Sequence, residues 1–171
     1  KIGHDESEKL AELRGPFPLW DKSIYKDQKP IRNCTVTTIA PTGEISILAG
    51  CSGGIEPHFG LTEIHKFEDR VLRRIRPSFY RLMEIARERG FYSPSFEEEI
   101  KNCGHVNERD DVPADIKKLF AITHDISPRW HVKMQAAFQK HTDNGVSKTI
   151  NLPNSDTITD VEKSYWQAYE T

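Results

Sequence analysis

The chain has 171 residues, of which 36% are apolar and 29% charged, enough for one domain with a hydrophobic core and a well solvated surface. Its net charge of −2 gives no field that would attract nucleic acid or an anionic membrane, and no apolar run is long enough to span a bilayer. Three irregularly spaced cysteines and the lack of a recognisable signal peptide predict a reducing, cytoplasmic setting.

The first predicted elements are a short helix and a strand. An amphipathic helix is expected over residues 6–14, ended by the Gly-Pro pair that follows it. The β-branched run from Thr35 to Ile39 favours a buried strand, because Val, Ile and Thr fit a pleated surface. Pro41 ends that strand, since it has no N–H to continue a ladder.

A tight turn and a helix start follow the predicted strand. Thr42 and Gly43 open residues 45–49, which have the pattern of the first turns of a helix. Unpaired N–H groups and the positive end of the helix dipole would then converge on one spot, which suits an anion. Gly43 allows close approach of a ligand, and Thr42 and Ser46 provide hydroxyl donors. The pattern therefore predicts a phosphate site.

Two observations favour a plainer interpretation of this turn. Strand–turn–helix junctions rich in Pro, Thr and Gly are common connectors that bind no ligand. Glu44 would also repel a phosphate unless its side chain points away. On spacing alone, the plain connector is favoured and the phosphate site stays open.

The longest helical pattern runs over residues 65–89 and is interrupted at Pro77. Its first half carries a basic cluster, which we interpret as a solvated helix face balanced by Glu68 and Asp69 rather than as a contact for nucleotide phosphates. The cluster consists of Arg70, Arg73, Arg74 and Arg76.

Three further helices are expected, over residues 95–102, over residues 114–123 and from Ser127-Pro128 onward. The last of them places a set of apolar residues on one stripe, which favours core packing against the sheet. The stripe consists of Trp130, Met134, Ala137 and Phe138.

Residues 147–152 favour a second strand, which a proline ends. Asn151 lies in it, and because a buried amide must find partners, both a structural hydrogen bond and a place in a cavity lining are open for it. His58 is a second candidate for a cavity lining, although a surface histidine explains it as well. The capping box Thr159-x-x-Glu162 predicts a final helix.

No metal site is expected, because no Cys-x-x-Cys or His-x-x-x-His pair occurs among the seven histidines and three cysteines. No nucleophile motif and no Walker or dinucleotide fingerprint is recognisable. Glu56 is interpreted as a structural, hydrogen-bonding carboxylate. Cys34, Cys51 and Cys103 are expected to be buried or partly buried free thiols.

Longer strings of the sequence resemble a known family. The segment Asn33-Cys-Thr-Val-Thr-Thr-Ile-Ala-Pro-Thr-Gly-Glu-Ile-Ser46, continued to Pro57, closely resembles a block of the adenosylcobalamin-dependent (class II) ribonucleotide reductases. Met134-Gln-Ala-Ala-Phe-Gln-Lys140 and Ser147-Lys-Thr-Ile-Asn-Leu-Pro153 resemble later blocks. The blocks lie in the family's order and span most of the chain, which makes the resemblance specific.

The resemblance implies an α/β fold, a helix-rich fragment of the ten-stranded ribonucleotide reductase α/β barrel. Residues 1–171 would be a partial catalytic barrel domain, truncated at both ends. In the family, the Pro-Thr-Gly-x-Ile-Ser turn grips the phosphates of the substrate. Glu44 departs from the Thr usual in relatives, which removes a hydroxyl donor and adds a charge. Carried over by position, the substrate phosphate-binding residues are Pro41, Thr42, Gly43, Glu44, Ile45 and Ser46.

The resemblance also implies radical reduction of ribonucleoside di- or triphosphates to 2′-deoxyribonucleotides, with adenosylcobalamin as the radical source of the full-length enzyme. The family's radical cysteine lies in an Asn-Pro-Cys-Gly-Glu loop, which this chain lacks, as it lacks the two redox cysteines. We therefore expect an excised piece without catalytic residues, inactive alone. Its expected partners are a ribonucleotide and the remainder of the polypeptide, and a homodimer is left open.

Two alternatives stay open. A class I large subunit, whose radical arrives from a separate metal-bearing subunit, is the first, although Ile-Ala-Pro-Thr-Gly and Met-Gln-Ala-Ala-Phe-Gln favour class II. A non-catalytic nucleotide-binding relative is the second, and Glu44 is the departure that hints at it.

Overall fold

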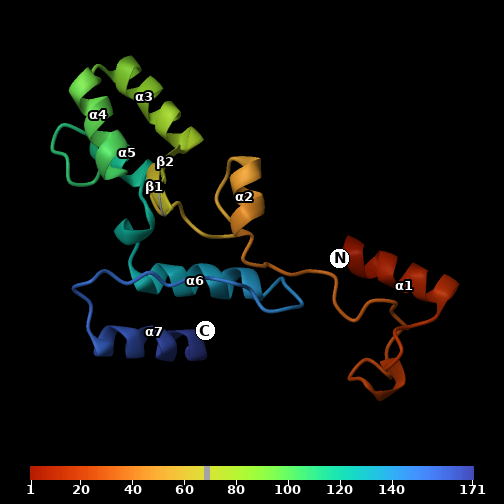
Figure 1. Cartoon of the computed structure of the whole chain (residues 1–171). Coiled ribbons are helices and arrows are strands. Elements are labelled where there is room, and N and C mark those ends of the chain that lie inside the picture. Colours follow the sequence, from red (N-terminus) through yellow and green to blue (C-terminus); the bar gives the residue numbers. More distant parts are fainter. Residues whose placement is uncertain (68–69) are drawn as a thin grey trace. The chain divides into compact units, whose positions relative to one another are not determined.

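The computed structural model of the chain describes residues 1–67 and 70–171 (Figure 1). The chain divides into two compact units. The first unit contains residues 1–40 and 137–146, and the second contains residues 41–136 and 147–171. Within the described ranges, no helix combines the length and the apolar character that a membrane crossing requires.

The first unit contains α1 (Ile2–Arg14), which begins earlier than predicted and ends where Gly15 takes a positive φ of 77°. Ser7, on the inner face of α1, is buried. Its hydroxyl donates to the carbonyl of Asn33 (3.2 Å) and accepts from the N–H of the same residue (2.8 Å). This pair of bonds fixes the chain that follows against α1.

The prediction of a sheet strand over residues 35–39 is wrong. Among the described residues, this segment makes a single parallel bridge, between Ile39 and Val146. The carboxylate of Asp143 accepts from the N–H of Val36 (2.8 Å), and such bonds to its charged form lower the pKa of Asp143. The β-branched pattern favours an extended backbone, but a ladder also needs neighbouring strands, which the described part of this unit does not supply.

The pattern that predicted one helix over residues 65–89 contains a hairpin and a shorter helix. β1 (Thr62–Phe67) pairs antiparallel with β2 (Arg70–Ile75), and α3 (Pro77–Arg89) begins at its proline. The helix prediction is therefore wrong for residues 65–67 and 70–76. Residues 68 and 69 lie outside the described residues.

The basic cluster predicted on that helix lies on the hairpin. Glu63 forms ion pairs with its cross-strand neighbour Arg74 (3.8 Å) and with Arg76 (2.6 Å), and Arg73 donates to the side chain of Asn102 (2.9 Å). These arginines are paired within the chain rather than spread over a helix face. The other members of the predicted arrangement lie outside the described side chains: Glu68, Asp69 and Arg70.

A hydrophobic core in the second unit joins α3, α4 (Pro94–Cys103) and α5 (Ala114–Leu119), which lie close together in Figure 1. α4 confirms the predicted helix, and the hydroxyl of Ser93 caps it by accepting from the N–H of Phe96 (3.0 Å). α5 ends earlier than predicted and is followed by a 3₁₀ turn, Thr123–Asp125. The fully buried core side chains include Phe79, Leu82, Phe96, Ile100, Val106 and Ile116.

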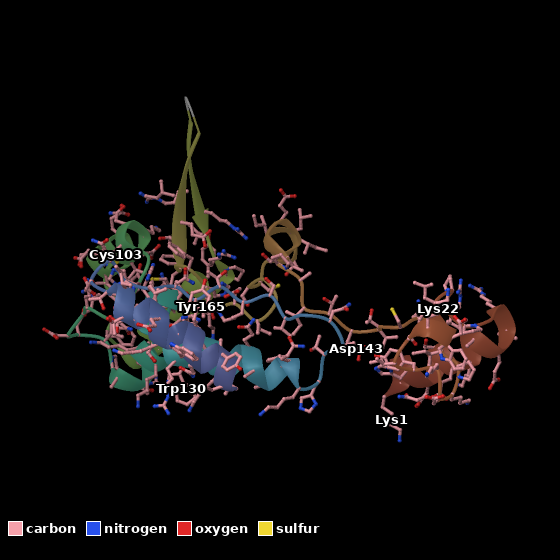
Figure 2. The ribbon with its side chains drawn as sticks, turned by 90° about the horizontal axis from the view of Figure 1, so that it is seen from below. Lys1, Lys22, Cys103, Trp130, Asp143 and Tyr165 are labelled. Carbon is pink, nitrogen blue, oxygen red and sulfur yellow. The ribbon has the colours of Figure 1, made fainter. Side chains whose placement is uncertain are left out.

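α6 (Pro128–Gln139) begins at the predicted proline, but its apolar stripe is not a core stripe. Trp130 is 60% and Met134 is 46% exposed, and the buried residues of α6 are His131 and Val132. Trp130 is labelled in Figure 2 together with Tyr165 of the last helix, which is also exposed. The prediction that the stripe packs against a sheet is therefore wrong.

The last helix, α7 (Ile158–Glu170), is confirmed, but its cap differs from the prediction. The carbonyl of Thr157 accepts from the N–H groups of Asp160 (3.0 Å) and Val161 (3.2 Å). The carboxylate of Asp160 accepts from the N–H of Thr157 (3.0 Å), in place of the predicted Thr159-x-x-Glu162 box. Gln167 of α7 donates to the carbonyl of Arg129 in α6 (3.1 Å). Residues 147–152 are described and form no strand, so that prediction is also wrong.

Replacing Phe96 with alanine should lower the free energy of unfolding by about 3–5 kcal/mol, because the ring is fully buried and its loss leaves a cavity. Urea unfolding followed by circular dichroism measures the change. Leu119→Ala is the matched control, since Leu119 is 67% exposed and its truncation should cost less than about 0.5 kcal/mol. Equal effects of the two substitutions would contradict this assignment of the core.

Protonation of His131 should destabilise the fold. His131 is 1% exposed, with Nε2 3.3 Å from the carbonyl oxygen of Thr123. Burial, and then the charge of Lys148, lower the pKa of His131 below its usual 6.5. The unfolded chain therefore binds this proton more readily, so the free energy of unfolding is highest above pH 6.5 and falls as the pH drops below that value.

Urea unfolding at about pH 7.5 and about pH 5.5 tests this dependence. In His131→Gln the loss of stability between the two conditions should be smaller than in the unsubstituted chain. An unchanged loss would show that another group titrates.

Candidate functional site

The predicted phosphate turn, residues 41–46, leads directly into α2 (Gly43–Ala49), so the predicted turn and helix start are confirmed. The N–H of Gly43 donates to the carbonyl of Pro41 (3.0 Å). The N–H of Ser46 donates to the carbonyl of Thr42 (3.1 Å) and closes the first helical turn. The amide of Gly43, one of those expected to face a ligand, is therefore already bonded within the turn.

Two backbone amides at the start of α2 are available to a ligand. Within the described part of the chain, the N–H groups of Glu44 and Ile45 have no hydrogen-bond acceptor, as is usual in the first turn of a helix. Both residues are exposed. An anion in front of α2 would satisfy these two amides.

The two predicted hydroxyl donors differ in the structure. Thr42 Oγ1 accepts from the N–H of Gly54 (2.9 Å), which leaves the proton of the Thr42 hydroxyl uncommitted among the described residues. Ser46 is 7% exposed, and its hydroxyl donates to the carbonyl of Gly43 (2.6 Å). A hydroxyl has one proton, so Ser46 stabilises the turn while Thr42 can donate to a ligand.

Glu44, which departs from the family pattern, lies in the first turn of α2 with its side chain exposed. The positive end of the helix dipole favours a negative charge at this place. The carboxylate of Glu44 therefore competes with a bound phosphate for the same end of the helix, unless it turns into the solvent.

An ion pair between a partly exposed glutamate and a buried lysine fixes the chain beyond α2. Glu56 Oε2 lies 2.5 Å from Lys148 Nζ, and Glu56 Oε1 accepts from the N–H of Thr149 at 2.5 Å. The side chain of Lys148 is 1% exposed. The interpretation of Glu56 as a structural, hydrogen-bonding carboxylate is confirmed. Its partner Lys148 was missed, because the two residues are 92 positions apart and no local pattern links them.

The two candidates for a cavity lining, His58 and Asn151, meet at the same residue. The carbonyl of His58 accepts from the N–H of Thr123 (2.9 Å), and the side-chain amide of Asn151 donates to Thr123 Oγ1 (2.7 Å). Burial, and then the charge of Arg76, lower the pKa of His58. Asn151 thus makes the structural hydrogen bond that the sequence left open, and a cavity role for either residue stays a prediction.

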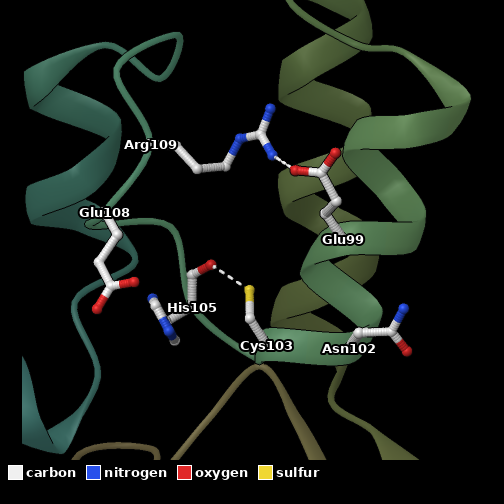
Figure 3. Close-up of a pocket in the computed structure, with 6 residues that line it drawn as sticks. All are labelled: Glu99, Asn102, Cys103, His105, Glu108 and Arg109. Carbon is white, nitrogen blue, oxygen red and sulfur yellow. Dashed lines mark hydrogen bonds and ion pairs between the residues drawn. The ribbon is translucent and has the colours of Figure 1, made fainter.

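Two surface pockets occur elsewhere in the second unit. The first has a volume of about 570 Å³ and is shown in Figure 3. The second, of about 500 Å³, shares Asn102, Cys103 and His105 with it. Neither lining includes a residue of the phosphate turn. The first pocket is lined by Glu99, Asn102, Cys103, His105, Glu108 and Arg109.

The three cysteines are free, as predicted, but all three are exposed, so the prediction of their burial is wrong. Cys103 Sγ donates to the carbonyl of His105 (3.2 Å), as Figure 3 shows. In the described ranges, no group of three or more His, Cys, Asp or Glu side chains is arranged to hold a metal ion.

Comparison with known proteins identifies relatives of the whole chain. The family described as "Ribonucleotide reductase, barrel domain" matches residues 26–171. A vitamin B12-dependent ribonucleoside-diphosphate reductase of Mycobacterium tuberculosis (strain CDC 1551 / Oshkosh) is 41% identical over 99% of the chain and 24% of its own length. The protein of the same name from Thermoplasma acidophilum is 43% identical over 96% of the chain and 21% of its own length.

A solved structure gives the fold. The alpha subunit of the class Id ribonucleotide reductase of Actinobacillus ureae superposes with a TM-score of 0.75 and 24% identity, covering 98% of the chain and 29% of that subunit. The predicted fold, a helix-rich fragment of the reductase barrel, is confirmed. The chain spans about a quarter of the length of the curated relatives it matches. The chain therefore belongs to the ribonucleotide reductase family and carries part of its barrel domain.

Proposed function

We propose that this chain supplies the substrate phosphate-binding turn, residues 41–46, of a ribonucleotide reductase. The enzyme would reduce ribonucleoside di- or triphosphates to 2′-deoxyribonucleotides by a radical mechanism. Relatives that are 41–43% identical are named ribonucleoside-diphosphate reductases, which supports a diphosphate substrate. One observation carries the proposal. The unpartnered amides of Glu44 and Ile45 lie at the start of the same helix as the uncommitted hydroxyl of Thr42, within a chain of the reductase barrel family.

The role of the turn is to position the substrate. Two amides and one hydroxyl would bind the phosphates, so that the ribose lies at a fixed place relative to the radical chemistry. Fixed geometry accelerates such a step because it removes translational and rotational entropy from the barrier. The three cysteines of this chain are not in the family's radical loop, and the chemistry would be supplied by the remainder of a longer polypeptide.

The cofactor proposed for the full-length enzyme is adenosylcobalamin, in keeping with the vitamin B12-dependent relatives. When bound, it would supply the radical. The two described pockets do not fit it, because volumes of about 570 and 500 Å³ are small for a corrinoid, which is a large, flat ring system. We therefore assign none of the described residues to the cofactor.

The proposal requires two partners, a ribonucleotide and the remainder of the polypeptide. Neither nucleic acid nor a membrane takes part in it, and it does not depend on a homodimer. Three exposed, free thiols support a reducing compartment, and we propose the cytoplasm.

Thr42→Val in the full-length protein should raise the KM for the ribonucleotide about tenfold and leave kcat nearly unchanged. The substitution keeps the shape of the side chain and removes the hydroxyl that donates to the phosphate, a loss of about 1.5 kcal/mol. Steady-state kinetics with a ribonucleoside diphosphate and a reductant measure both constants.

Thr38→Val is the matched control, because Thr38 is an exposed threonine outside the turn. It should leave KM unchanged. If Thr42→Val also leaves KM unchanged, the turn does not bind the phosphates.

Activity of the full-length protein should depend on added adenosylcobalamin and on no second protein subunit. The measurement is ribonucleotide reduction by the purified protein with and without the cofactor. Activity that needs a separate metal-bearing subunit and ignores the cofactor would identify a class I large subunit. Nucleotide binding without turnover under either condition would identify a non-catalytic relative.

A further inference from the structure

We propose that Glu56 is a positioning residue for substrate binding: its carboxylate ties the turn at residues 53–56 to residues 148–149 and so holds Thr42 in the orientation that receives a phosphate. The inference rests on the proposed function of residues 41–46 as the phosphate turn. It assigns a specific task to a charged pair that touches no substrate itself.

The carboxylate of Glu56 makes two short contacts with one short segment, residues 148–149. Oε2 pairs with Lys148 Nζ (2.5 Å), and Oε1 accepts from the N–H of Thr149 (2.5 Å). Lys148 Nζ also donates to the carbonyl of Thr149 (2.6 Å). Each oxygen therefore has its own partner, and the geometry fixes the carboxylate in position and in rotation.

The constraint passes from Glu56 to the phosphate turn through backbone hydrogen bonds. The N–H of Glu56 donates to the carbonyl of Gly53 (2.8 Å), which closes a tight turn. The next residue of that turn, Gly54, donates its N–H to Thr42 Oγ1 (2.9 Å). This bond occupies a lone pair of Thr42 and so directs the hydroxyl proton away from Gly54.

The turn also lies directly against the phosphate loop. A Cβ atom added at Gly53 would lie 3.4 Å from the carbonyl oxygen of Thr42, 3.5 Å from its Oγ1 and 3.6 Å from Ser46 Oγ. These are ordinary packing distances, so the backbone at Gly53 is a near neighbour of the loop. A shift of the 53–56 turn would therefore move Thr42.

The charge of Glu56 matters because Lys148 is buried. A cation that is 1% exposed has little water around it, and loss of its counter-ion leaves an uncompensated charge. Without that charge on Glu56, Lys148 would have to reach solvent, and residues 148–149 would leave the 53–56 turn. The hydroxyl of Thr42 would then be misplaced, while the groups that carry out the radical chemistry would be unchanged.

The test is Glu56→Gln in the full-length protein. Glutamine keeps the size of the side chain and an acceptor for the N–H of Thr149, but removes the charge. The KM for a ribonucleoside diphosphate should rise about tenfold while kcat changes less than about twofold, as expected for the loss of one charge-assisted hydrogen bond. Binding of the unphosphorylated nucleoside should be unchanged, a difference that general loss of stability would not produce.

Lys148→Met is a second variant, for the case that Glu56→Gln does not fold. It removes the same ion pair but leaves the carboxylate of Glu56, which is 28% exposed and can be solvated. It should raise KM in the same direction. Glu97→Gln is the matched control: Glu97 pairs with Lys101 (2.8 Å) on α4 and should give an unchanged KM.

The double variant Thr42→Val/Glu56→Gln separates the two levels of the proposal. If Glu56 acts through Thr42, its KM should rise less than the product of the two single effects. If Thr42→Val raises KM but Glu56→Gln and Lys148→Met do not, the positioning role is overturned and the phosphate turn stands. If Thr42→Val has no effect, the phosphate turn itself is overturned.

Discussion

The contact between Glu56 and Lys148 is the constraint on which the candidate site depends. It joins the chain just after α2 to a segment 92 residues further on, where the N–H of Thr149 also donates to the Glu56 carboxylate. Because Lys148 is nearly inaccessible to water, loss of the Glu56 carboxylate would leave the charge of Lys148 buried without a counter-ion. A buried pair of this kind contributes little net stability, but it allows few alternative arrangements of the two segments, and position is what a phosphate site requires.

The turn itself combines groups that are already bonded with groups that are not. Gly43 and Ser46 stabilise the start of α2 from within, and this leaves the amides of Glu44 and Ile45 and the proton of Thr42 for a ligand. Such a division makes the site rigid before the ligand arrives, so that binding orders few additional groups. Glu44 acts against this arrangement, since its charge favours the same helix end as a phosphate does.

The sequence predicted correctly those features that depend on a few neighbouring residues. The Ser127-Pro128 pair marked the start of α6 correctly, because such a signal acts within a few residues. The hairpin was missed because its charged residues have a helical spacing, whereas the cross-strand pairing of Glu63 with Arg74 depends on the fold. The segments at 35–39 and 147–152 have strand-like composition but lack partner strands among the described residues. The turn and the start of α2 were predicted from local residues, Thr42 and Gly43, whereas the role of Lys148 could not be predicted, since it depends on a distant residue.

The distance along the chain between Glu56 and Lys148 has a consequence during protein synthesis. Residues 41–56 leave the ribosome well before their anchor has been translated, and at about 5–20 residues per second the delay is roughly 5–20 s for the 92 intervening positions. During that interval the nascent turn has its internal hydrogen bonds but not the contacts of Glu56 with Lys148 and Thr149. The proposed phosphate turn therefore acquires its contact with residues 148–149 only after the segment that contains Lys148 has emerged.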